Sequence, residues 1–337
     1  MRIALVGLGE IATNEHLPAL LANPKAELCA VVDVDEHRLS AVGAGLSDQV
    51  LRSTDLADAL VRSDPDAMVL ATPPWVTPGV VETLLAAGKY VLAEKPLAVN
   101  MAATEALQAL DPGQLARLQI GFTFRHDPAI ERLRDLIRDG SFGSPLLVRI
   151  GFFGEPADPH GNPAQHARIL RELGYAPPIV HEGAHFCDWL NLLLPEPPEE
   201  VSGWCFKTDP ALPAANVNGH VIRYPDGTTV LFEVAWLYPP GRQPHGFISF
   251  TGPDAHADLD PDSYELRLAT HERTEVMRGH GERHARCFGI QLERFLASVE
   301  SGTPCTPGIR EALASLNYTD MLVASMEGAD RLTVSPS

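Results

Sequence analysis

Three short segments combine residue types and spacings that could support chemistry. The first is a glycine-rich turn at residues 7–12, the second is Lys95 at the end of an apolar stretch, and the third is the pair His181 and His185. Glycines let a backbone approach a bound phosphate, a lysine can stabilise negative charge on a substrate oxygen, and a histidine can exchange a proton near neutral pH. Together the segments indicate a ligand-binding or catalytic protein.

The glycine turn, Gly7-Leu8-Gly9-Glu10-Ile11-Ala12, has the form GxGxxA and follows an apolar stretch, Ile3–Val6, that predicts a strand. Gly7 permits a tight turn, Gly9 lets the backbone approach a pyrophosphate, and Ala12 lets the following helix pack closely on a sheet. The N-terminus of that helix offers N–H groups and a partial positive charge to phosphates. A turn that merely links a strand to a helix is the alternative. The predicted dinucleotide contacts are Gly7, Gly9, Glu10, Ile11 and Ala12.

Asp33 ends the second expected strand, Leu28–Val32. An acidic side chain at this place in a dinucleotide-binding fold accepts hydrogen bonds from the ribose hydroxyls and repels a 2′-phosphate. The sequence therefore favours NAD as the cofactor. NADP is the alternative, because His37 and Arg38 follow closely in the sequence.

Lys95 stands where the expected strand Tyr90–Ala93 ends in Glu94-Lys95-Pro96. Pro96 lacks an N–H group and restricts the backbone, so the strand stops and Lys95 is held at its carboxyl end. Ligands of open parallel sheets bind at that edge. There the lysine could donate hydrogen bonds to a substrate oxygen and stabilise developing negative charge. The alternative is an exposed lysine in a turn.

The segment His181-Glu182-Gly183-Ala184-His185 has the form HExxH. On a continuous helix the two histidines share a face and could bind zinc, with Glu182 as the general base of a peptidase. The glycine in the middle of the pattern and Pro177-Pro178 before it argue against this interpretation. His185 could instead be a general base that takes the proton of a substrate hydroxyl, or a histidine of the core.

The elements that position these residues change in type along the chain. The first 120 residues alternate strands with helices, which indicates a parallel sheet covered on both faces. A helix is expected over Thr54–Arg62, with Thr54 as its cap, and another over Val80–Ala87, ended by Gly88. Pro18 lies where the first helix would continue, so we expect that helix to end or restart near Thr13-Asn14.

After residue 120 the pattern predicts a different kind of domain. A strand is expected over Gln119–Phe124, and Pro225-Asp226-Gly227 predicts a hairpin between Val217–Tyr224 and Thr228–Trp236. Trp204, Trp236 and Tyr238 fall in strand patterns and indicate sheet packing or an oligomer face. The further expected helices are 128–140, Ala164–Leu173, Ala184–Leu194, 281–301 and 307–328.

These patterns predict an α/β protein of two domains. Residues 1–120 form a Rossmann domain with a doubly wound parallel sheet that binds NAD(P). Residues 121–337 form an α+β domain with an open, mainly antiparallel sheet for the substrate and for oligomerisation.

Charge and cysteine content exclude several classes of partner. The chain has 26 basic and 44 acidic residues and a formal net charge of −18, which disfavours nucleic acid and anionic membrane surfaces. The sequence has no apolar run that approaches the roughly 18 residues of a spanning helix. The 5 cysteines are scattered without a CxxC pair, which is typical of a reduced, cytoplasmic protein.

The combined motifs resemble the glucose–fructose oxidoreductase/inositol dehydrogenase (Gfo/Idh/MocA) family. The resemblance rests on the GxGxxA turn, Asp33, Ala71-Thr72-Pro73, Glu94-Lys95-Pro96, Arg125-His126-Asp127-Pro128 and the segment 183–188. It implies hydride transfer between a nicotinamide cofactor and a hydroxyl or keto carbon of a sugar, nucleotide-sugar or cyclitol. It also implies a homo-oligomer, either a dimer or a tetramer.

The resemblance implies roles for individual residues. Thr72, Pro73, Glu94 and Lys95 would contact the cofactor, and Lys95 would also bind the substrate oxygen. His185 would be the general base, and Glu182 or His181 would orient it.

The sequence departs from the family pattern at two positions. Thr77 stands where the family often has histidine, and His181 stands where it commonly has aspartate. The change at position 181 leaves open a nucleotide-sensing regulatory protein of the same fold without catalysis. The zinc peptidase is a more remote alternative.

Overall fold

The computed structural model describes residues 1–154, 163–237, 245–261, 263, 265–278 and 283–327. The chain forms two compact units, one made of Met1–Asp127 with Glu282–Leu316 and the other of Pro128–Gly281 with Asn317–Ser337. The helix that begins at Arg283 thus belongs to the first unit, whereas the sequence patterns had grouped it with the second. The assignment of cofactor binding to 1–120 and of substrate binding to 121–337 stays a prediction.

The first unit contains the predicted parallel sheet. Its six strands lie in the order β3-β2-β1-β4-β5-β6, and every neighbouring pair is parallel. This order reverses direction between β1 and β4, which is the arrangement of a Rossmann fold. The strands are β1 Arg2–Val6, β2 Glu27–Val32, β3 Leu51–Ser53, β4 Ala67–Leu70, β5 Tyr90–Ala93 and β6 Leu118–Ile120.

Helices cover both faces of this sheet, because successive side chains of a strand point to opposite sides. In β1, Ile3 and Leu5 pack with α1 and α11, whereas Ala4 and Val6 pack with α3 and α4. The elements of this unit are η1 Ala12–His16, α1 Leu17–Ala22, α2 Glu36–Gly43, α3 Leu56–Ser63, α4 Thr77–Ala86, η2 Ala102–Thr104, α5 Glu105–Gln108, α6 Pro112–Leu115, η3 Thr123–His126, α11 Arg283–Ser301 and the first part of α12 Ile309–Glu327.

The first helix is irregular, but it does not end or restart near Thr13-Asn14 as expected from Pro18. A π-helical segment, η1, runs over Ala12–His16 and passes directly into α1 at Leu17, and both His16 and Leu17 have helical backbone angles. The missing N–H group of Pro18 is thus accommodated by a local change of the hydrogen-bond pattern rather than by a break in the helix. The wider π turn places His16 at the end of the segment that follows the glycine turn.

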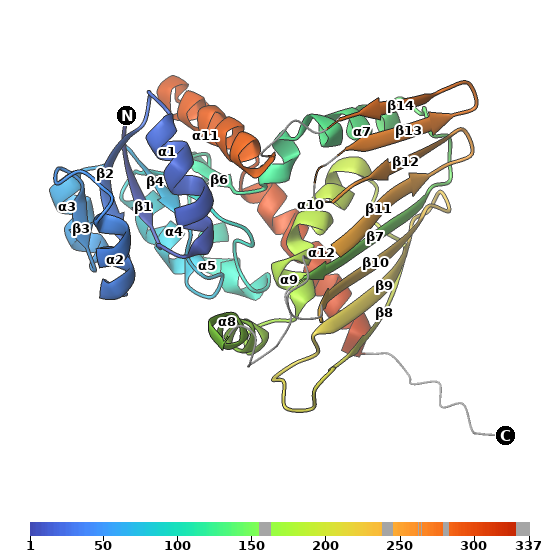
Figure 1. The fold of residues 1–337 in the computed structure, drawn as a ribbon, viewed down its shortest axis with the longest axis horizontal. Helices are drawn as coiled ribbons and strands as arrows, with labels where there is room; N and C mark the ends of the chain where they lie inside the picture. The colour runs from blue at the N-terminus through green and yellow to red at the C-terminus, as the bar shows by residue number, and fades with distance from the viewer. Residues whose placement is uncertain (155–162, 238–244, 262, 264, 279–282, 328–337) are drawn as a thin grey trace. The chain divides into compact units, whose positions relative to one another are not determined.

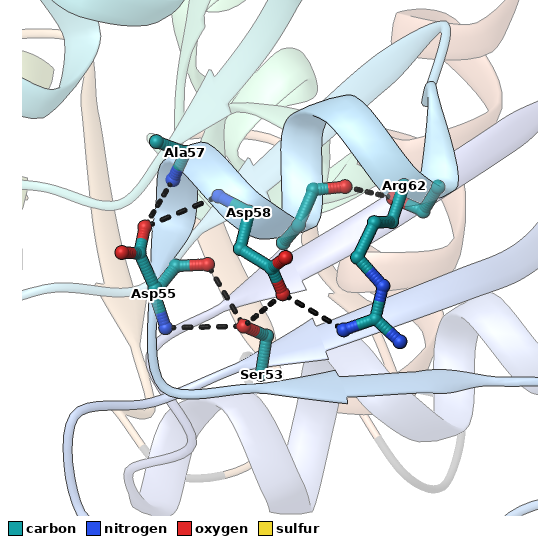
Figure 2. Close-up of polar contacts among 7 residues, drawn as sticks. Ser53, Asp55, Ala57, Asp58 and Arg62 are labelled. Atoms are coloured by element: carbon teal, nitrogen blue, oxygen red, sulfur yellow. Dashed lines mark hydrogen bonds and ion pairs between the residues drawn. The ribbon is translucent and has the colours of Figure 1, made fainter.

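Helix α3 begins later than predicted, and its cap is Asp55 rather than Thr54 (Figure 2). One carboxylate oxygen of Asp55 accepts the N–H groups of Ala57 at 2.7 Å and Asp58 at 3.1 Å. An aspartate in this position satisfies two exposed N–H groups at once, which explains the shift.

The strand predicted over Gln119–Phe124 is shorter in the structure. Strand β6 ends at Ile120 and is followed by the 3₁₀ turn η3. Its partner β5 ends at Ala93, opposite Ile120, and the N–H of Gly121 makes the last hydrogen bond to β5, to the carbonyl of Ala93. The two strands therefore end together.

The second unit contains an open sheet of eight strands in the order β14-β13-β12-β11-β7-β10-β9-β8 (Figure 1). Strands β7 and β10 are parallel, and the other neighbours are antiparallel, so the predicted, mainly antiparallel sheet and the fold class are confirmed. The strands are β7 Leu147–Gly154, β8 Glu200–Phe206, β9 Val217–Arg223, β10 Thr229–Trp236, β11 His245–Thr251, β12 Ala255–Leu259, β13 Leu266–Thr270 and β14 Thr274–Met277.

The two faces of this sheet differ. On one face Phe186 packs against Phe152, Phe232 and Trp189, which joins helix α10 to strands β7 and β10. The opposite face exposes large apolar side chains, among them Leu147, Trp204 and Phe206. The helices of this unit are α7 Pro128–Arg138, α8 Pro163–Leu173, α9 Pro178–His181, α10 Gly183–Leu193 and the last part of α12.

The predicted aromatic strand residues fall on different sides. Trp236 is fully buried against the helices, whereas Trp204 is 44% exposed and stacks on Phe206. Tyr238 lies outside the described residues. Within the described part of the chain, no helix has both the length and the apolar character that a bilayer crossing requires.

Candidate active site

The glycine turn lies at the carboxyl end of β1. Gly7 has φ +82°, and a Cβ atom added there would stand 2.5 Å from the carbonyl oxygen of Ala71, so only glycine fits. A Cβ atom added at Gly9 meets nothing within 4 Å. The structure thus leaves open space beside Gly9, where the sequence predicts that a pyrophosphate approaches.

The helix N-terminus after the turn suits an anion. The N–H of Thr13 donates to the carbonyl of Gly9 at 3.0 Å, which is the first helical hydrogen bond. The preceding N–H groups, up to that of Ala12, therefore have no acceptor within the helix. Glu10 and Ile11 are exposed at this point. These features fit the phosphate part of the predicted cofactor.

Asp33 is buried and fixed beside the glycine turn. Its Oδ2 accepts the N–H of Leu8 at 2.7 Å, and its Oδ1 accepts the N–H of Asp35 at 2.8 Å. Each carboxylate oxygen can accept a second hydrogen bond, so the arrangement also fits the predicted ribose contact. The contact to Leu8 joins residues 25 positions apart, and for that reason the sequence pattern did not indicate it.

Thr72 and Pro73 follow β4 and are tied to the start of α4. The hydroxyl of the buried Thr77 lies 3.0 Å from the carbonyl oxygens of both residues and 2.9 Å from the Thr72 hydroxyl. Thr77 thereby fixes the loop that the sequence predicts to contact the cofactor. This is the position where the family often has histidine.

Lys95 follows β5 and is half-buried. Gly7, Asp33, Thr72 and Lys95 come after β1, β2, β4 and β5 respectively, which are parallel neighbours in one sheet. Because the carboxyl ends of parallel strands meet at the same edge, the structure brings these predicted residues to one edge. At this edge of the sheet the strand order reverses between β1 and β4.

Glu94 is buried, and its carboxylate is occupied by protein contacts. Oε1 lies 2.8 Å from Nε2 of His16, and Oε2 accepts the N–H of Lys95 at 3.1 Å. No sequence pattern indicates His16 as the partner of Glu94, because the two residues are 78 positions apart and neither motif points to the other. The predicted contact of Glu94 with the cofactor stays a prediction.

The HExxH segment does not form one helix. Helix α9 ends at His181, Glu182 is the junction, and α10 begins at Gly183. The two histidines therefore do not share the continuous helix that the zinc interpretation requires. Among the residues that the structure describes, no three histidine, cysteine, aspartate or glutamate side chains are grouped as metal ligands.

His181 and His185 have different surroundings. His181 is buried, its ring stacks on Trp236 with centroids 5.5 Å apart, and Nε2 lies 3.3 Å from the carbonyl oxygen of Glu172. His185 and Glu182 are half-buried. The packing of His181 favours a structural role, and the predicted catalytic roles of His185, Glu182 and His181 stay predictions.

His126, in the motif that resembles the entry to the second domain, is also buried. Its Nδ1 lies 2.9 Å from a guanidinium nitrogen of Arg294 in α11. Burial, followed by the charges of Arg294 and Arg125, lowers the pKa of His126 to about 4. The imidazole is therefore neutral at physiological pH.

Comparison with known proteins connects these features to one family. Residues 1–122 match the model of an oxidoreductase family with an NAD-binding Rossmann fold, and residues 130–254 match the GFO/IDH/MocA C-terminal domain. The chain is 24% identical to inositol 2-dehydrogenase of Rhizobium meliloti (strain 1021) over 350 residues, which cover 99% of each chain.

Two further relatives share parts of this similarity. The chain is 32% identical over 190 residues to a dTDP-3,4-didehydro-2,6-dideoxy-alpha-D-glucose 3-reductase of Streptomyces antibioticus, covering 55% of this chain and 56% of the reductase. The crystal structure of an oxidoreductase domain protein from Kribbella flavida superposes with a TM-score of 0.83 at 22% identity, covering 96% of each chain. Two consecutive domain models, the full-length relative and the shared fold agree: the chain belongs to the Gfo/Idh/MocA family of oxidoreductases.

Proposed function

We propose that this protein is an NAD(P)-dependent dehydrogenase or reductase acting on a hydroxyl or keto carbon of a polyhydroxylated substrate. The observation that carries the proposal is the edge of the parallel sheet, where the glycine turn, Asp33 and Lys95 follow strands β1, β2 and β5 of one sheet. A nucleotide-binding turn and a lysine at one edge are the parts that hydride transfer to or from a carbonyl needs. A sensor would need only the nucleotide-binding turn.

The cofactor would be held by backbone and carboxylate groups of the first unit. N–H groups of Gly9, Glu10, Ile11 and Ala12 would bind the pyrophosphate, and Asp33 would accept the ribose hydroxyls. The negative charge of Asp33 favours NAD over NADP, because it repels a 2′-phosphate. Bound nicotinamide supplies the acceptor or donor of the hydride.

The protein side chains would manage the oxygen and its proton. The ammonium group of Lys95 donates a hydrogen bond to the substrate oxygen and stabilises its negative charge. His185 takes the hydroxyl proton during oxidation and returns it during reduction. Glu182 or His181 orients the imidazole; the burial of His181 under Trp236 favours Glu182 for this role.

The substrate class follows from the relatives. The full-length relative is named for inositol and the partial one for a nucleotide sugar, so cyclitols come first, and sugars and nucleotide sugars follow. A panel of these compounds with NAD⁺ and NADP⁺, followed by absorbance of the reduced cofactor, tests the proposal. Turnover with at least one compound is expected, faster with NAD⁺. Tight cofactor binding without turnover across the panel would instead favour the sensor.

The open sheet of the second unit supports a homo-oligomer. The face opposite helix α10 exposes Leu147, Trp204 and Phe206 at 42%, 44% and 50%. Exposed apolar groups of this size on one sheet face are typical of an interface. Sedimentation of the wild type and of Trp204→Glu tests this: a dimer or tetramer that dissociates in the variant is expected, and a monomeric wild type would contradict it.

The cysteines support a reducing compartment. All five are free thiols in the structure. We propose a cytoplasmic location on this basis.

A further inference from the structure

A buried pair, His16 and Glu94, joins the turn that carries Lys95 to the segment that follows the glycine turn. Nε2 of His16 lies 2.8 Å from Oε1 of Glu94, and the two residues are only 4% and 8% exposed. His16 is the last residue of η1, and Glu94 directly precedes Lys95. The pair thus connects the two segments to which cofactor binding and substrate binding are assigned.

The carboxylate of Glu94 is held from three sides. Oε1 faces His16, and Oε2 accepts the backbone N–H of Lys95 at 3.1 Å. On the third side lies Gly121, where an added Cβ atom would stand 2.9 Å from Oε1 and 3.1 Å from Oε2. The backbone of Gly121 is itself fixed, because its N–H donates to the carbonyl of Ala93 at 2.7 Å. The carboxylate therefore has little room to move.

The imidazole of His16 is fixed as well. The ring of Phe288 in α11 meets it edge to face, with centroids 4.9 Å apart and an interplanar angle of 88°. The ring thus has an apolar neighbour and a polar partner, and both restrict its orientation. A rigid imidazole gives the carboxylate a rigid partner.

Stability alone does not explain a buried ionisable pair. Withdrawing a carboxylate and an imidazole from water is costly, and well-packed apolar side chains often serve stability equally well or better. Apolar side chains would not fix a direction, whereas the hydrogen bonds of the pair specify where the backbone N–H of Lys95 points. We propose that His16 and Glu94 are positioning residues that set the backbone of Lys95 and hence the place of its ammonium group. The inference rests on the proposed role of Lys95 in binding the substrate oxygen.

Two variants break the pair in different ways, and one preserves it. His16→Leu removes the donor, and Gly121→Ala pushes a methyl group against the carboxylate without removing any ionisable group. His16→Gln retains an N–H donor in place of Nε2. Ser63→Ala is the matched control, because it removes a different buried hydrogen bond of the first unit, from the Ser63 hydroxyl to the carbonyl of Ala59.

The kinetic readout is the division of the effect between kcat and KM. His16→Leu and Gly121→Ala are expected to lower kcat by about tenfold to a hundredfold, because a misplaced catalytic group costs rate. The KM for NAD⁺ should stay within about threefold, and His16→Gln should recover most of kcat, since the donor is kept. Ser63→Ala should match the wild type. The inference is overturned if kcat of the two disrupting variants equals that of the control, or if His16→Gln is as slow as His16→Leu.

Amide hydrogen exchange at Lys95 gives a readout that needs no turnover. Faster exchange of this amide in His16→Leu and Gly121→Ala, with wild-type exchange in His16→Gln and Ser63→Ala, supports the pair as the group that holds the Lys95 backbone. Unchanged exchange in the disrupting variants overturns it. If the wild type turned over no compound of the panel, the proposed function would fail, and the exchange measurement would still decide the placement of Lys95.

Discussion

The edge of the parallel sheet and the HExxH segment of the second unit, residues 181–185, show two ways in which candidate catalytic and binding residues are positioned. At the sheet edge, Gly7, Asp33 and Lys95 each stand within two residues of a strand end, and the topology brings them to one edge. In the HExxH segment, His181 and His185 are four positions apart but lie on different helices with different burial. Position along a parallel strand is thus a better guide to a site than spacing along a helix that breaks.

The sharpest test of this contrast compares the two histidines. His185→Ala is expected to lower kcat by about 10² to 10⁴, the range for losing a general base. His181→Phe keeps a ring against Trp236 and should change kcat by less than about threefold, because packing is then preserved. Steady-state kinetics with the best substrate of the panel measures both. Equal losses in the two variants would break the proposed division of roles.

Lys95 comes next in expected effect. Lys95→Met keeps the length and apolar stem of the side chain but removes the ammonium group, so kcat should fall by about 10² to 10³, as for a lost oxyanion donor. NADH affinity, measured by fluorescence titration, should stay within about threefold, because the pyrophosphate and ribose contacts are elsewhere. Lys89→Met is the control, since Lys89 forms an ion pair with the exposed Asp64. Undiminished turnover of Lys95→Met would remove Lys95 from the mechanism.

Substitutions at the two glycines of the turn should affect different properties, cofactor binding at Gly9 and stability at Gly7. Gly9→Val fills the open space beside the turn and is expected to weaken NADH binding by about tenfold or more with little loss of stability. Gly7→Ala forces a Cβ atom against the Ala71 carbonyl at positive φ, so it should destabilise the protein by about 1–3 kcal/mol. Titration and thermal unfolding of both variants measure this. A stable Gly7→Ala variant, or a Gly9→Val variant that binds normally, would contradict the interpretation of the turn.

Each unit also contains a buried neutral histidine, so we expect the folded state of both units to lose stability in acid. Burial lowers the pKa of His220 to about 4, and burial with nearby arginines lowers that of His126 to about 4. In the unfolded chain these histidines take up protons near the ordinary histidine pKa of about 6.5, so above that pH neither histidine lowers the free energy of unfolding. The free energy of unfolding should fall by about 1.4 kcal/mol per pH unit per histidine as the pH drops from about 6.5 towards 4.

Denaturant unfolding at several pH values checks this expectation. His220→Leu should remove one histidine's share of the slope in the second unit. An unchanged slope in that variant would show that His220 is not among the groups responsible.

The local sequence determined the turns, the strand ends and the order of the elements, because each of these depends on the backbone conformation of a few neighbouring residues. A glycine pattern between a strand and a helix, an acidic residue at the next strand end, and proline after Lys95 each act through backbone conformation over a few residues. Alternation of strands with helices likewise required a parallel sheet, and the Pro225-Asp226-Gly227 turn produced the hairpin between β9 and β10. These features follow from short-range sterics and burial, which depend on neighbouring residues in the sequence.

Tertiary structure decided what no short pattern contains. The contact of Asp33 with Leu8, the pairing of His16 with Glu94 and the stacking of His181 on Trp236 join residues 25, 78 and 55 positions apart. The end of β6 depends on where its neighbour β5 stops, and α11 packs with the first unit although it follows the second in the sequence. Such contacts arise when elements distant in the chain bury their apolar faces together, so their partners are chosen by packing rather than by local sequence.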